Sequence, residues 1–276
     1  ENVGIAAVGF GLGCLGLTWS QPALVIAGFG GGVLHLFNHA LFKCLLFYAA
    51  GAIHRATHTV DLERLGGLAR AMPWTAGLFL VGGLAIAGLP PFNGFWSEFL
   101  IIGGLADGGA PTVLGNVALA TAAALLGFVG AVSALAITRA FGMAFLGTAR
   151  DPKLQPAEAP PSMRWVMVAH GVGVIAVGLV PALGLALVQP VVDQFARTLD
   201  HRATVAAGLG DAGRAVWIVS AVLGATLALG WALTRRARRH VTWACGYTVA
   251  TPRLQYTATS FSAAFNRLFD VVLPAR

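Results

Sequence analysis

Charged side chains are scarce in this sequence of 276 residues. Lysine and arginine contribute 18 residues and aspartate and glutamate 11, so that only 11% of the chain is charged. A soluble globular domain is typically about 25% charged. This chain therefore lacks the charge that would cover a water-exposed surface, and the ordinary soluble classes of protein are excluded.

Cysteine is rare as well. Cys14, Cys44 and Cys245 form no CxxC pair, and two of the three lie in apolar segments. Neither a disulfide framework nor a thiolate metal site is expected from such a pattern.

Apolar residues, in contrast, make up 57% of the chain. Uncharged apolar segments of 18 or more residues recur along it, and such segments are the signature of membrane-spanning helices. We therefore predict an all-α, polytopic transmembrane helical bundle in a lipid bilayer.

The net charge of +7 raises the alternative of nucleic-acid binding. The basic residues lie mostly between the apolar runs, however, and four of them directly follow the last run: Arg235, Arg236, Arg238 and Arg239. This placement is typical of the cytoplasmic flanks of membrane helices, whereas a nucleic-acid surface needs a basic patch or stripe. We expect no nucleic-acid partner.

The apolar runs predict six membrane segments. Their expected ranges are 2–17, 23–53, 74–105 with a break at 90–94, 112–146, 165–188 and 215–233. The connection 189–213 is polar, with a short surface helix expected on Val192, Phe195 and Leu199. The tail ends in an amphipathic pattern that would lie on a membrane or partner surface, formed by Phe261, Phe265, Leu268, Phe269 and Val272.

The distribution of basic residues predicts which side of the membrane each loop faces. The loops after the second and fourth segments and the tail after the sixth fall on one side, and they hold most of the arginines. By the positive-inside rule this side is cytoplasmic. We expect a multi-pass protein of the cell inner (plasma) membrane with a cytoplasmic C-terminal tail.

Three ionisable side chains interrupt the apolar stretch HLFNHALFKCLLFYAAG, residues 35–51. His35, His39 and Lys43, here called the ionisable row, are four residues apart and stack along one helix face over roughly 12 Å. A charge at membrane depth costs roughly 2.5–3.5 kcal/mol per residue. A row of three such costly groups therefore indicates that they serve a function in the membrane.

The ionisable row has three interpretations. The first is a packed polar seam that neighbouring helices satisfy. The second is a metal pair, which fits the HxxxH spacing, but no third acidic or thiolate ligand is nearby and Lys43 adds a cation. The third, which we favour, is a proton relay. Histidine titrates near neutrality, and burial of a lysine brings its proton exchange toward the working pH.

The segment 74–105 contains the sequence GLPPFNGF. Pro90 and Pro91 remove two amide donors and Gly94 relaxes the backbone, so the helix is expected to break. Broken backbone persists in a membrane only where protein or a water-filled cavity satisfies it. Glu98 follows directly, and an interrupted helix beside a buried carboxylate is a device that transporters use. We predict Glu98 as the terminus of the ionisable row.

The sequence GLGCLG at residues 11–16 matches the GxGxxG pattern of dinucleotide sites. No strand is expected before it and no acidic residue follows at the required distance, so a dinucleotide site is not expected. The glycines of this segment suit close helix packing in lipid instead: Gly9, Gly13 and Gly16.

The stretch that contains HLFNHALFKCLLFYAAG, GLPPFNGF and WSEFL resembles the antiporter-like membrane subunits that respiratory complex I, Mrp cation/proton antiporters and membrane-bound hydrogenases share. The matched block runs from residue 1 to about residue 104. Glu98 stands where many large complex I and Mrp subunits have a lysine. The tail TWACGYTVATPRLQYTATSFSAAFNRLF resembles the hydrogenase-4 and formate hydrogenlyase branch of the family.

This resemblance implies two inverted five-helix repeats, each with a broken helix, and a charged axis along the membrane centre. It aligns the ionisable row with the relay helix of the second repeat and Glu98 with the terminal residue on its broken helix. It groups 1–147 as part of the second repeat, 148–234 as additional helices and 235–276 as a basic and amphipathic tail. The first repeat has no counterpart here, so we expect the C-terminal part of a longer subunit, with the missing N-terminal half among its partners.

The resemblance also implies a function. It points to a proton-translocating membrane-arm subunit of a hydrogenase-4, formate-hydrogenlyase-like or complex-I-related redox complex, which would hold no cofactor itself. Its expected partners are other membrane-arm subunits and a hydrophilic redox arm. Two alternatives stay open: a Mrp-type sodium/proton antiporter subunit, and a structural membrane anchor for a soluble redox arm.

Overall fold

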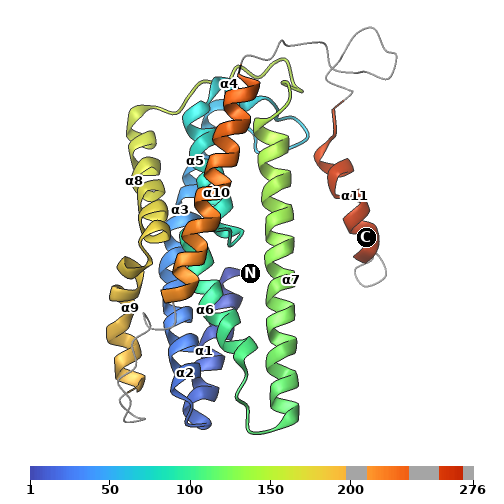
Figure 1. The fold of residues 1–276 in the computed structure, drawn as a ribbon. Helices are drawn as coiled ribbons and strands as arrows, with labels where there is room; N and C mark the ends of the chain where they lie inside the picture. Colours follow the sequence, from blue (N-terminus) through green and yellow to red (C-terminus); the bar gives the residue numbers. More distant parts are fainter. Residues whose placement is uncertain (197–209, 236–254, 270–276) are drawn as a thin grey trace.

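The computed structural model describes residues 1–196, 210–235 and 255–269, and every regular element in these ranges is a helix. The elements are α1 (Asn2–Thr18), α2 (Pro22–Val25), the π-helical turn η1 (Ile26–Gly30), α3 (Gly31–Thr57), α4 (Leu68–Ala71), α5 (Pro73–Ile86), α6 (Asn93–Asp107), α7 (Val113–Phe145), α8 (Pro161–Leu179), α9 (Pro181–Ala196), α10 (Gly210–Thr234) and α11 (Ala258–Phe269). Figure 1 shows an elongated bundle of roughly parallel and antiparallel helices. The predicted all-helical architecture is confirmed.

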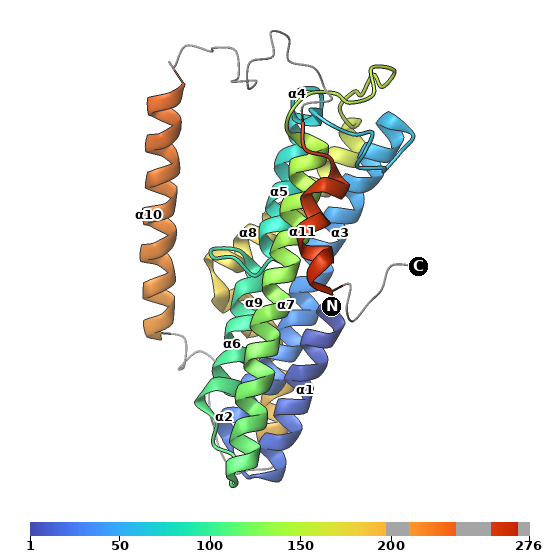
Figure 2. The ribbon, with the colours of Figure 1, turned by 90° about the vertical axis from the view of Figure 1, so that its right-hand side faces the viewer.

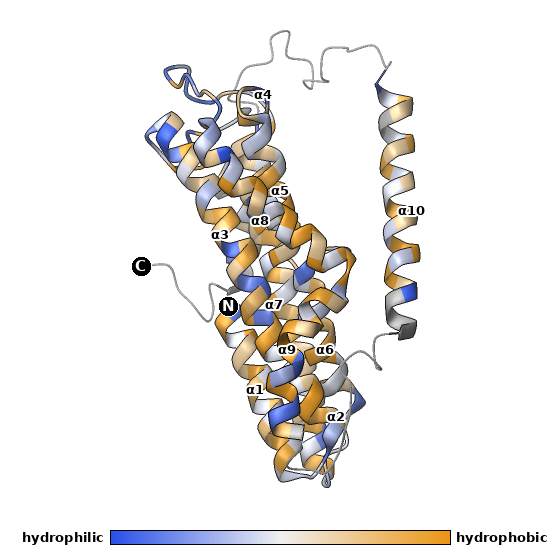
Figure 3. Ribbon diagram, turned by 90° about the vertical axis from the view of Figure 1, so that its left-hand side faces the viewer, coloured by the Kyte–Doolittle hydropathy of each residue, from blue (hydrophilic) through white to orange (hydrophobic). Residues whose placement is uncertain are grey.

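Within the described residues, four helical stretches are long and apolar enough to cross a membrane. They are Pro22–Thr57, Val113–Phe145, Pro161–Leu179 and Arg214–Thr234. Two shorter apolar helices, α1 and α5, accompany them. Much of the helical ribbon in Figure 3 has the colours of hydrophobic residues, as expected for membrane helices.

α3 is the centre of the bundle and packs against α1, α5, α6 and α8. Its fully buried side chains follow one another at helical spacing: His35, Asn38, Phe42, Leu45 and Ala49. Residues three or four apart lie on the same face of a helix. The face of α3 that points into the bundle therefore carries polar groups near its beginning and apolar groups further along.

Glycines allow α1 to lie directly on the second membrane helix. A Cβ atom added to Gly9 would lie 2.9 Å from the Cα of Gly32, and one added to Gly16 would lie 2.6 Å from the backbone nitrogen of Val25. Larger side chains would hold the two backbones apart. The prediction that these glycines serve close packing is confirmed.

The predicted break within 74–105 is present. α5 ends at Ile86 and α6 begins at Asn93, so residues 87–92, which include Pro90 and Pro91, are not helical. Gly88 has a φ of +63°, a left-handed conformation that favours glycine. Gly94 lies inside the first turn of α6, where an added Cβ would collide with the carbonyl oxygen of Ala85.

The single helix expected over 165–188 is instead two helices. α8 ends at Leu179, and α9 begins at Pro181 and continues to Ala196. Pro181 has no amide hydrogen, so the regular hydrogen bonding of α8 stops at this point. The apolar pattern continues across the proline, and for that reason it concealed this second break.

The short surface helix expected within 189–213 is also absent from the described part of that segment. Residues 189–196 continue α9, and Val192 is fully buried in an apolar cluster with Leu34, Trp96, Leu185 and Val188. Leu199 lies outside the described residues.

Most of the basic residues in the described part of the chain gather at one end of the bundle. The loop 58–67, the loop 146–160 and the last turn of α10 lie at the upper end in Figure 1. This basic end carries Arg55, Arg64, Arg70, Arg150, Lys153, Arg164 and Arg235. Of the described segments at the opposite end, 18–22, 107–112 and 190–196 contain no lysine or arginine, whereas Arg214 lies in the first turns of α10, at the other end of that helix from Arg235. This asymmetry is the basis of the predicted membrane orientation.

α10 stands apart from the other helices along most of its length (Figure 2). Its large apolar side chains are exposed, among them Trp217, Ile218, Val222, Leu227 and Leu233. In a bilayer, a helix of this composition is surrounded by lipid or by another membrane subunit.

α11 lies against α7 and close to the loops of the basic end (Figure 2). Glu63 accepts hydrogen bonds from both the backbone nitrogen and the hydroxyl of Thr259, each 2.6 Å long. Arg150 donates to the carbonyl oxygen of Tyr256 at 2.9 Å. The amphipathic helix predicted in the tail is therefore present, whereas Val272 and three residues of the arginine cluster lie outside the described residues.

Candidate functional site: a polar junction at a broken helix

A buried hydrogen-bond network joins α3 to the beginning of α6. The Nδ1 atom of His35 lies 3.0 Å from the hydroxyl of Ser97, and Asn38 donates to the same hydroxyl at 3.2 Å. Asn38 also donates to the carbonyl of Asn93 at 2.8 Å, and Asn93 donates back to the side-chain oxygen of Asn38 at 3.1 Å. These four side chains, here called the polar junction, are all fully buried.

Ser97 and Asn2 are the hydrogen-bonding partners of His35. When the Ser97 hydroxyl donates to the carbonyl of Gly94, 2.9 Å away, it accepts from Asn38 and from the Nδ1 of His35. The Nε2 atom of His35 lies 3.2 Å from the side-chain oxygen of Asn2. Both ring nitrogens of this buried imidazole therefore have a polar partner, and the position of the ring proton follows the orientation of the Ser97 hydroxyl and of the Asn2 amide.

Glu98 points at the broken backbone. A Cβ atom added to Gly88 would lie 2.5 Å from a carboxylate oxygen of Glu98, and one added to Gly130 of α7 would lie 4.0 Å from the same oxygen. The carboxylate is therefore at the break between α5 and α6 and faces α7. Ser133 of α7 donates a 3.4 Å hydrogen bond to the last carbonyl of α5, that of Ile86.

α6 connects two polar regions through consecutive residues. Successive positions of a helix differ by about 100° in direction. Ser97 faces α3 and contacts His35, whereas Glu98 faces the break and α7. The polar junction and the Glu98 carboxylate are therefore neighbours on either side of the first turns of α6.

His39 and Lys43 continue the ionisable row away from the junction. Both are half-buried, and Phe42 packs edge-on against the His39 ring with centroids 5.6 Å apart. The ammonium of Lys43 lies 5.5 Å from the centre of the Phe47 ring. Within the described residues no hydrogen bond or ion pair joins Glu98 to His39 or Lys43, and the member of the row that contacts α6 is His35.

The second break packs on the first. The indole nitrogen of Trp96 donates a 2.7 Å hydrogen bond to the carbonyl oxygen of Gly178, near the end of α8. Pro181 prevents α8 from continuing regularly, and the Trp96 indole supplies a donor to a carbonyl at this end. A Cβ on Gly178 would lie 2.8 Å from the Cα of Phe92 and would collide with the carbonyl oxygen of Pro91.

The polar junction has one open acceptor. The side-chain oxygen of Asn93 is buried and has no hydrogen-bond partner within the described part of the chain. A buried polar atom without a partner is costly, and such atoms commonly bind an ordered water. The position of Asn93 at the first residue of α6 puts this acceptor beside the break.

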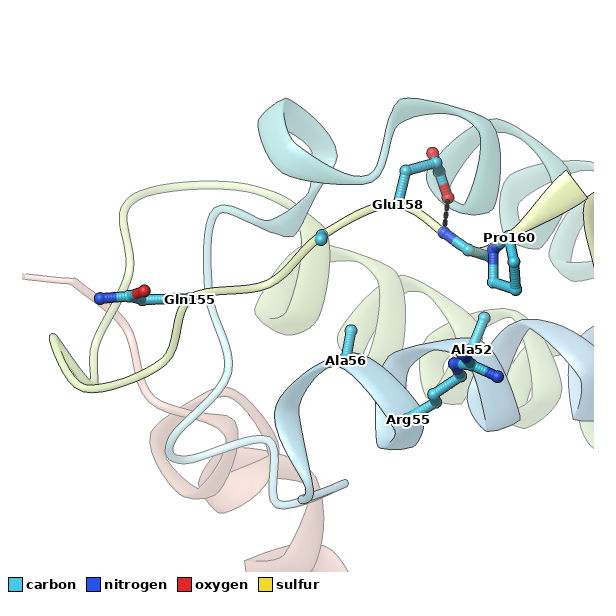
Figure 4. Close-up of a pocket in the computed structure, with 8 residues that line it drawn as sticks. Ala52, Arg55, Ala56, Gln155, Glu158 and Pro160 are labelled. Carbon is cyan, nitrogen blue, oxygen red and sulfur yellow. Dashed lines mark hydrogen bonds between the residues drawn. The ribbon is translucent and has the colours of Figure 1, made fainter.

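A separate cavity of about 350 Å³ lies at the basic end (Figure 4). It is lined by Ala52, Arg55 and Ala56 of α3 and by Gln155, Ala157, Glu158, Ala159 and Pro160. Ala52 follows Lys43 by nine residues, which is about half a turn out of phase on a helix. The cavity therefore opens on a different face of α3 from Lys43.

Sequence reasoning did not select Asn38, Asn93, Ser97, Trp96 or Gly178. A signal for the first three was present, because each is a polar side chain within an apolar run. Asn38 follows His35 by three residues, a spacing that places both on one helix face. No group of three His, Cys, Asp or Glu side chains that could hold a metal ion occurs among the described residues.

A protein-family model matches the part of the chain that contains the candidate site. A sequence model described as "NADH:quinone oxidoreductase/Mrp antiporter, TM" matches residues 12–143, a range that contains the ionisable row, the polar junction and Glu98. Residues 12–143 belong to this family of antiporter-like membrane subunits, and together with the long apolar helices they make the chain an integral membrane protein.

Two curated relatives come from Escherichia coli (strain K12). Hydrogenase-4 component B is 34% identical over 268 residues, which cover 90% of this chain and 39% of that protein. Formate hydrogenlyase subunit 3 is 33% identical over 287 residues, which cover 100% of this chain and 45% of that protein. The chain therefore spans less than half the length of these relatives.

A solved structure has the same fold. A chain of the membrane-bound sulfane sulfur reductase, an archaeal respiratory membrane complex, superposes with a TM-score of 0.60 at 18% sequence identity. The match covers 98% of this chain and 48% of that chain. The predicted architecture of an antiporter-like membrane subunit agrees with this likeness.

Proposed function

We propose that the chain carries protons through the membrane as a non-redox subunit of a hydrogenase-like or complex-I-like assembly. The observation that carries the proposal is the buried contact of His35 with Ser97 at a broken helix, one residue from Glu98. Ionisable residues at membrane depth are expensive and mark ion or proton pathways when they face a bundle interior.

The proposed route follows α3 from Lys43 through His39 to His35 and crosses to α6 at Ser97. Neighbouring members of the row are about 6 Å apart along the helix axis, so bridging waters pass the proton between them. The open side-chain oxygen of Asn93 supports a water at the crossing. In this order Glu98 follows His35, whereas sequence spacing alone suggests the order His35, His39, Lys43 and then Glu98.

Glu98 is the proposed end of the route, at the break. Residues 87–92 have backbone groups outside regular helical bonding, and in a membrane such groups need protein or water as partners. A carboxylate there binds and releases a proton next to that water. Interrupted helices beside charged groups serve the same purpose in transporters.

The proposal extends to organisation and partners. The relatives are, by name, components of hydrogenase-4 and of formate hydrogenlyase. We propose other membrane-arm subunits and a hydrophilic redox arm as partners, and an N-terminal half of the subunit that extends the polar axis. In this scheme 1–147 belongs to the second inverted repeat, 148–234 adds helices, and the tail 235–276 and the basic end face the cytoplasm of a plasma membrane.

The test replaces Glu98 with glutamine in the assembled complex. Glutamine keeps the size and polarity of the side chain, but it has no carboxyl group that can bind and release a proton. We expect proton translocation in membrane vesicles to fall by about tenfold or more, while the complex remains assembled on native gels. Glu63→Gln, an acid in a loop of the basic end, is the matched control. Translocation at the unmodified rate in Glu98→Gln would disprove the proposal.

A second function, sodium/proton exchange of the Mrp type, is favoured by one observation. The Glu98 carboxylate lies beside irregular backbone at the break, and carboxylate and carbonyl oxygens are the ligands that transporters offer to Na⁺. Sodium-dependent exchange in vesicles without any redox subunit would support this function over the first. A structural anchor, the third function, predicts that Lys43→Met leaves both turnover and ion movement unchanged.

A further inference from the structure

The cavity at the basic end has a neighbour further along α3, and the two together are here called the groove between α3 and α8. A second cavity, of about 230 Å³, is lined by Tyr48 of α3 and by Ser162, Met163 and Val166 of α8. On α3, Tyr48 precedes Ala52 by four residues and Ala56 by eight, so the three lie on one face. The two cavities therefore follow one another along α3, the first opposite residues 155–160 and the second opposite the first turns of α8.

The groove changes in chemical character along its length. Its outer part carries the Arg55 guanidinium and the Gln155 amide at the basic end (Figure 4). Its inner part, lined by Tyr48, Met163 and Val166, is apolar. Tyr48 lies about 10 Å from Arg55 along the axis of α3. A ligand that fits both parts has an anionic end and an apolar chain.

Arg55 is available to such a ligand. Within the described residues, no carboxylate pairs with its guanidinium and no acceptor binds it, and the side chain is exposed. The nearest acid of the lining, Glu158, is occupied elsewhere. Its two oxygens accept from the backbone nitrogen of Trp74 at 2.7 Å, the hydroxyl of Thr75 at 2.6 Å and the backbone nitrogen of Ala159 at 2.8 Å.

The pKa of Glu158 is consistent with this arrangement. Burial alone would raise the pKa of the carboxyl, but the hydrogen bonds from Thr75, Ala159 and Trp74 outweigh burial and hold it below the ordinary value. Glu158 thus stays ionised as the cap of the N-terminus of α5, where a negative charge is favourable. It does not neutralise Arg55 through a direct contact.

Aromatic side chains place the outer part of the groove at the membrane surface. Trp74 and Trp165, at the beginnings of α5 and α8, are 53% and 70% exposed, and they line a small cavity together with Arg164. Tryptophan and arginine in this combination are typical of the interface between headgroups and hydrocarbon. Arg55 is therefore at headgroup level, and Tyr48, about 10 Å further along α3, is at the level of acyl chains.

We propose that the groove between α3 and α8 binds an anionic phospholipid. Its phosphate contacts the Arg55 guanidinium, and one acyl chain lies along Tyr48, Met163 and Val166. Charge complementarity at one end and the apolar continuation at the other favour a lipid over free phosphate or a peptide. The proposal is independent of the proton route, because the groove lies on a different face of α3 from Lys43.

The experiment uses the assembled complex in nanodiscs that contain phosphatidylglycerol with a photoreactive acyl chain. We expect cross-links to peptides that contain Tyr48 and residues 162–166, and a reduction of about fivefold or more in Arg55→Gln and in Ala56→Leu, which fills the outer cavity. Arg70→Gln, an exposed arginine at the same end that lines neither cavity, should keep the wild-type yield.

Three controls make the result decisive. A zwitterionic phosphatidylcholine probe should cross-link the groove weakly, and inorganic phosphate should not compete with phosphatidylglycerol. The proposal fails if Arg55→Gln retains the wild-type cross-links, if both lipids label the groove equally, or if inorganic phosphate displaces the lipid. Native gels of each variant show that the complex is assembled.

Discussion

The indole nitrogen of Trp96 lies 2.7 Å from the carbonyl oxygen of Gly178 and donates a hydrogen bond to it. Trp96 is in the first turns of α6 after the first break, and Gly178 is two residues before the second. The two interruptions, about ninety positions apart in the sequence, are thus joined by a buried contact. Trp96 also immediately precedes Ser97 and Glu98, so this contact positions the polar junction.

Replacing Trp96 with phenylalanine keeps an aromatic ring but removes the donor. The Gly178 carbonyl would lose its partner, and a buried unsatisfied carbonyl costs about 1–3 kcal/mol. We expect a lower thermal midpoint of the complex and slower proton transport, with the pH profile of transport shifted because Ser97 and Glu98 move. Trp165→Phe, at an exposed tryptophan of α8, should leave the thermal midpoint, the transport rate and the pH profile unchanged.

Replacing Gly178 with alanine tests the contact from the other side. The added methyl group would collide with the backbone of residues 91–92, so the two breaks would separate. We expect cysteine labelling at an introduced Leu89→Cys to change in rate by about threefold or more, because the break segment moves. Gly77→Ala, at a glycine of α5 with open space around it, is the control. Unchanged labelling in Gly178→Ala would show that the two breaks are not coupled.

Ser97→Ala tests the crossing point of the proposed route. The substitution removes the acceptor of His35 Nδ1 and of the Asn38 amide in a fully buried site, and leaving such donors unsatisfied costs about 1–3 kcal/mol. We expect assembly to persist and proton transport to fall by about tenfold. Thr138→Val, which removes a hydroxyl that bonds within its own helix, should leave transport unchanged. Full transport in Ser97→Ala would remove Ser97 from the route.

The docking of α11 should depend on pH in the acid range. Hydrogen bonds from the side chain and the backbone of Thr259 hold the pKa of Glu63 below its ordinary value. Docking is therefore fully favoured at neutral pH, weakens as the pH falls below about 4.3, and is lost below the lowered pKa. The mobility of a spin label at Asn266→Cys, in a background without native cysteines, should rise in this range.

Glu63→Ala provides the comparison for that titration. In this variant the label should be mobile at neutral pH as well, because Thr259 has lost its acceptor. A label whose mobility rises at the same pH in both proteins would show that Glu63 does not hold α11.

Much of this fold follows from local features of the sequence. Apolar runs longer than a bilayer crossing predict the helices, and two adjacent prolines predict the break at residues 87–92. Helical spacing places His35, His39 and Lys43 on one helix. It does not show that His35 forms a hydrogen bond with Ser97 of α6, because that depends on how α3 and α6 cross.

The features that the sequence did not reveal also depend on contacts between helices. The break at Pro181 lies within an uninterrupted apolar pattern. The carbonyl oxygen of Gly178, just before this break, accepts a hydrogen bond from Trp96 of α6, which is distant in the sequence. Asn93 and Ser97 are single polar residues whose partners come from α3. Spacing within one helix gives no information about partners on another.

Infrared difference spectroscopy of the assembled complex during turnover tests the proton route most directly. A proton that reaches Glu98 produces a carboxyl C=O signal, and we predict that this signal is present in the unmodified complex and in Glu63→Gln. It should be missing in Glu98→Gln and weakened in Ser97→Ala. A carboxyl signal of unchanged size in Glu98→Gln would contradict the proposal that Glu98 receives the proton.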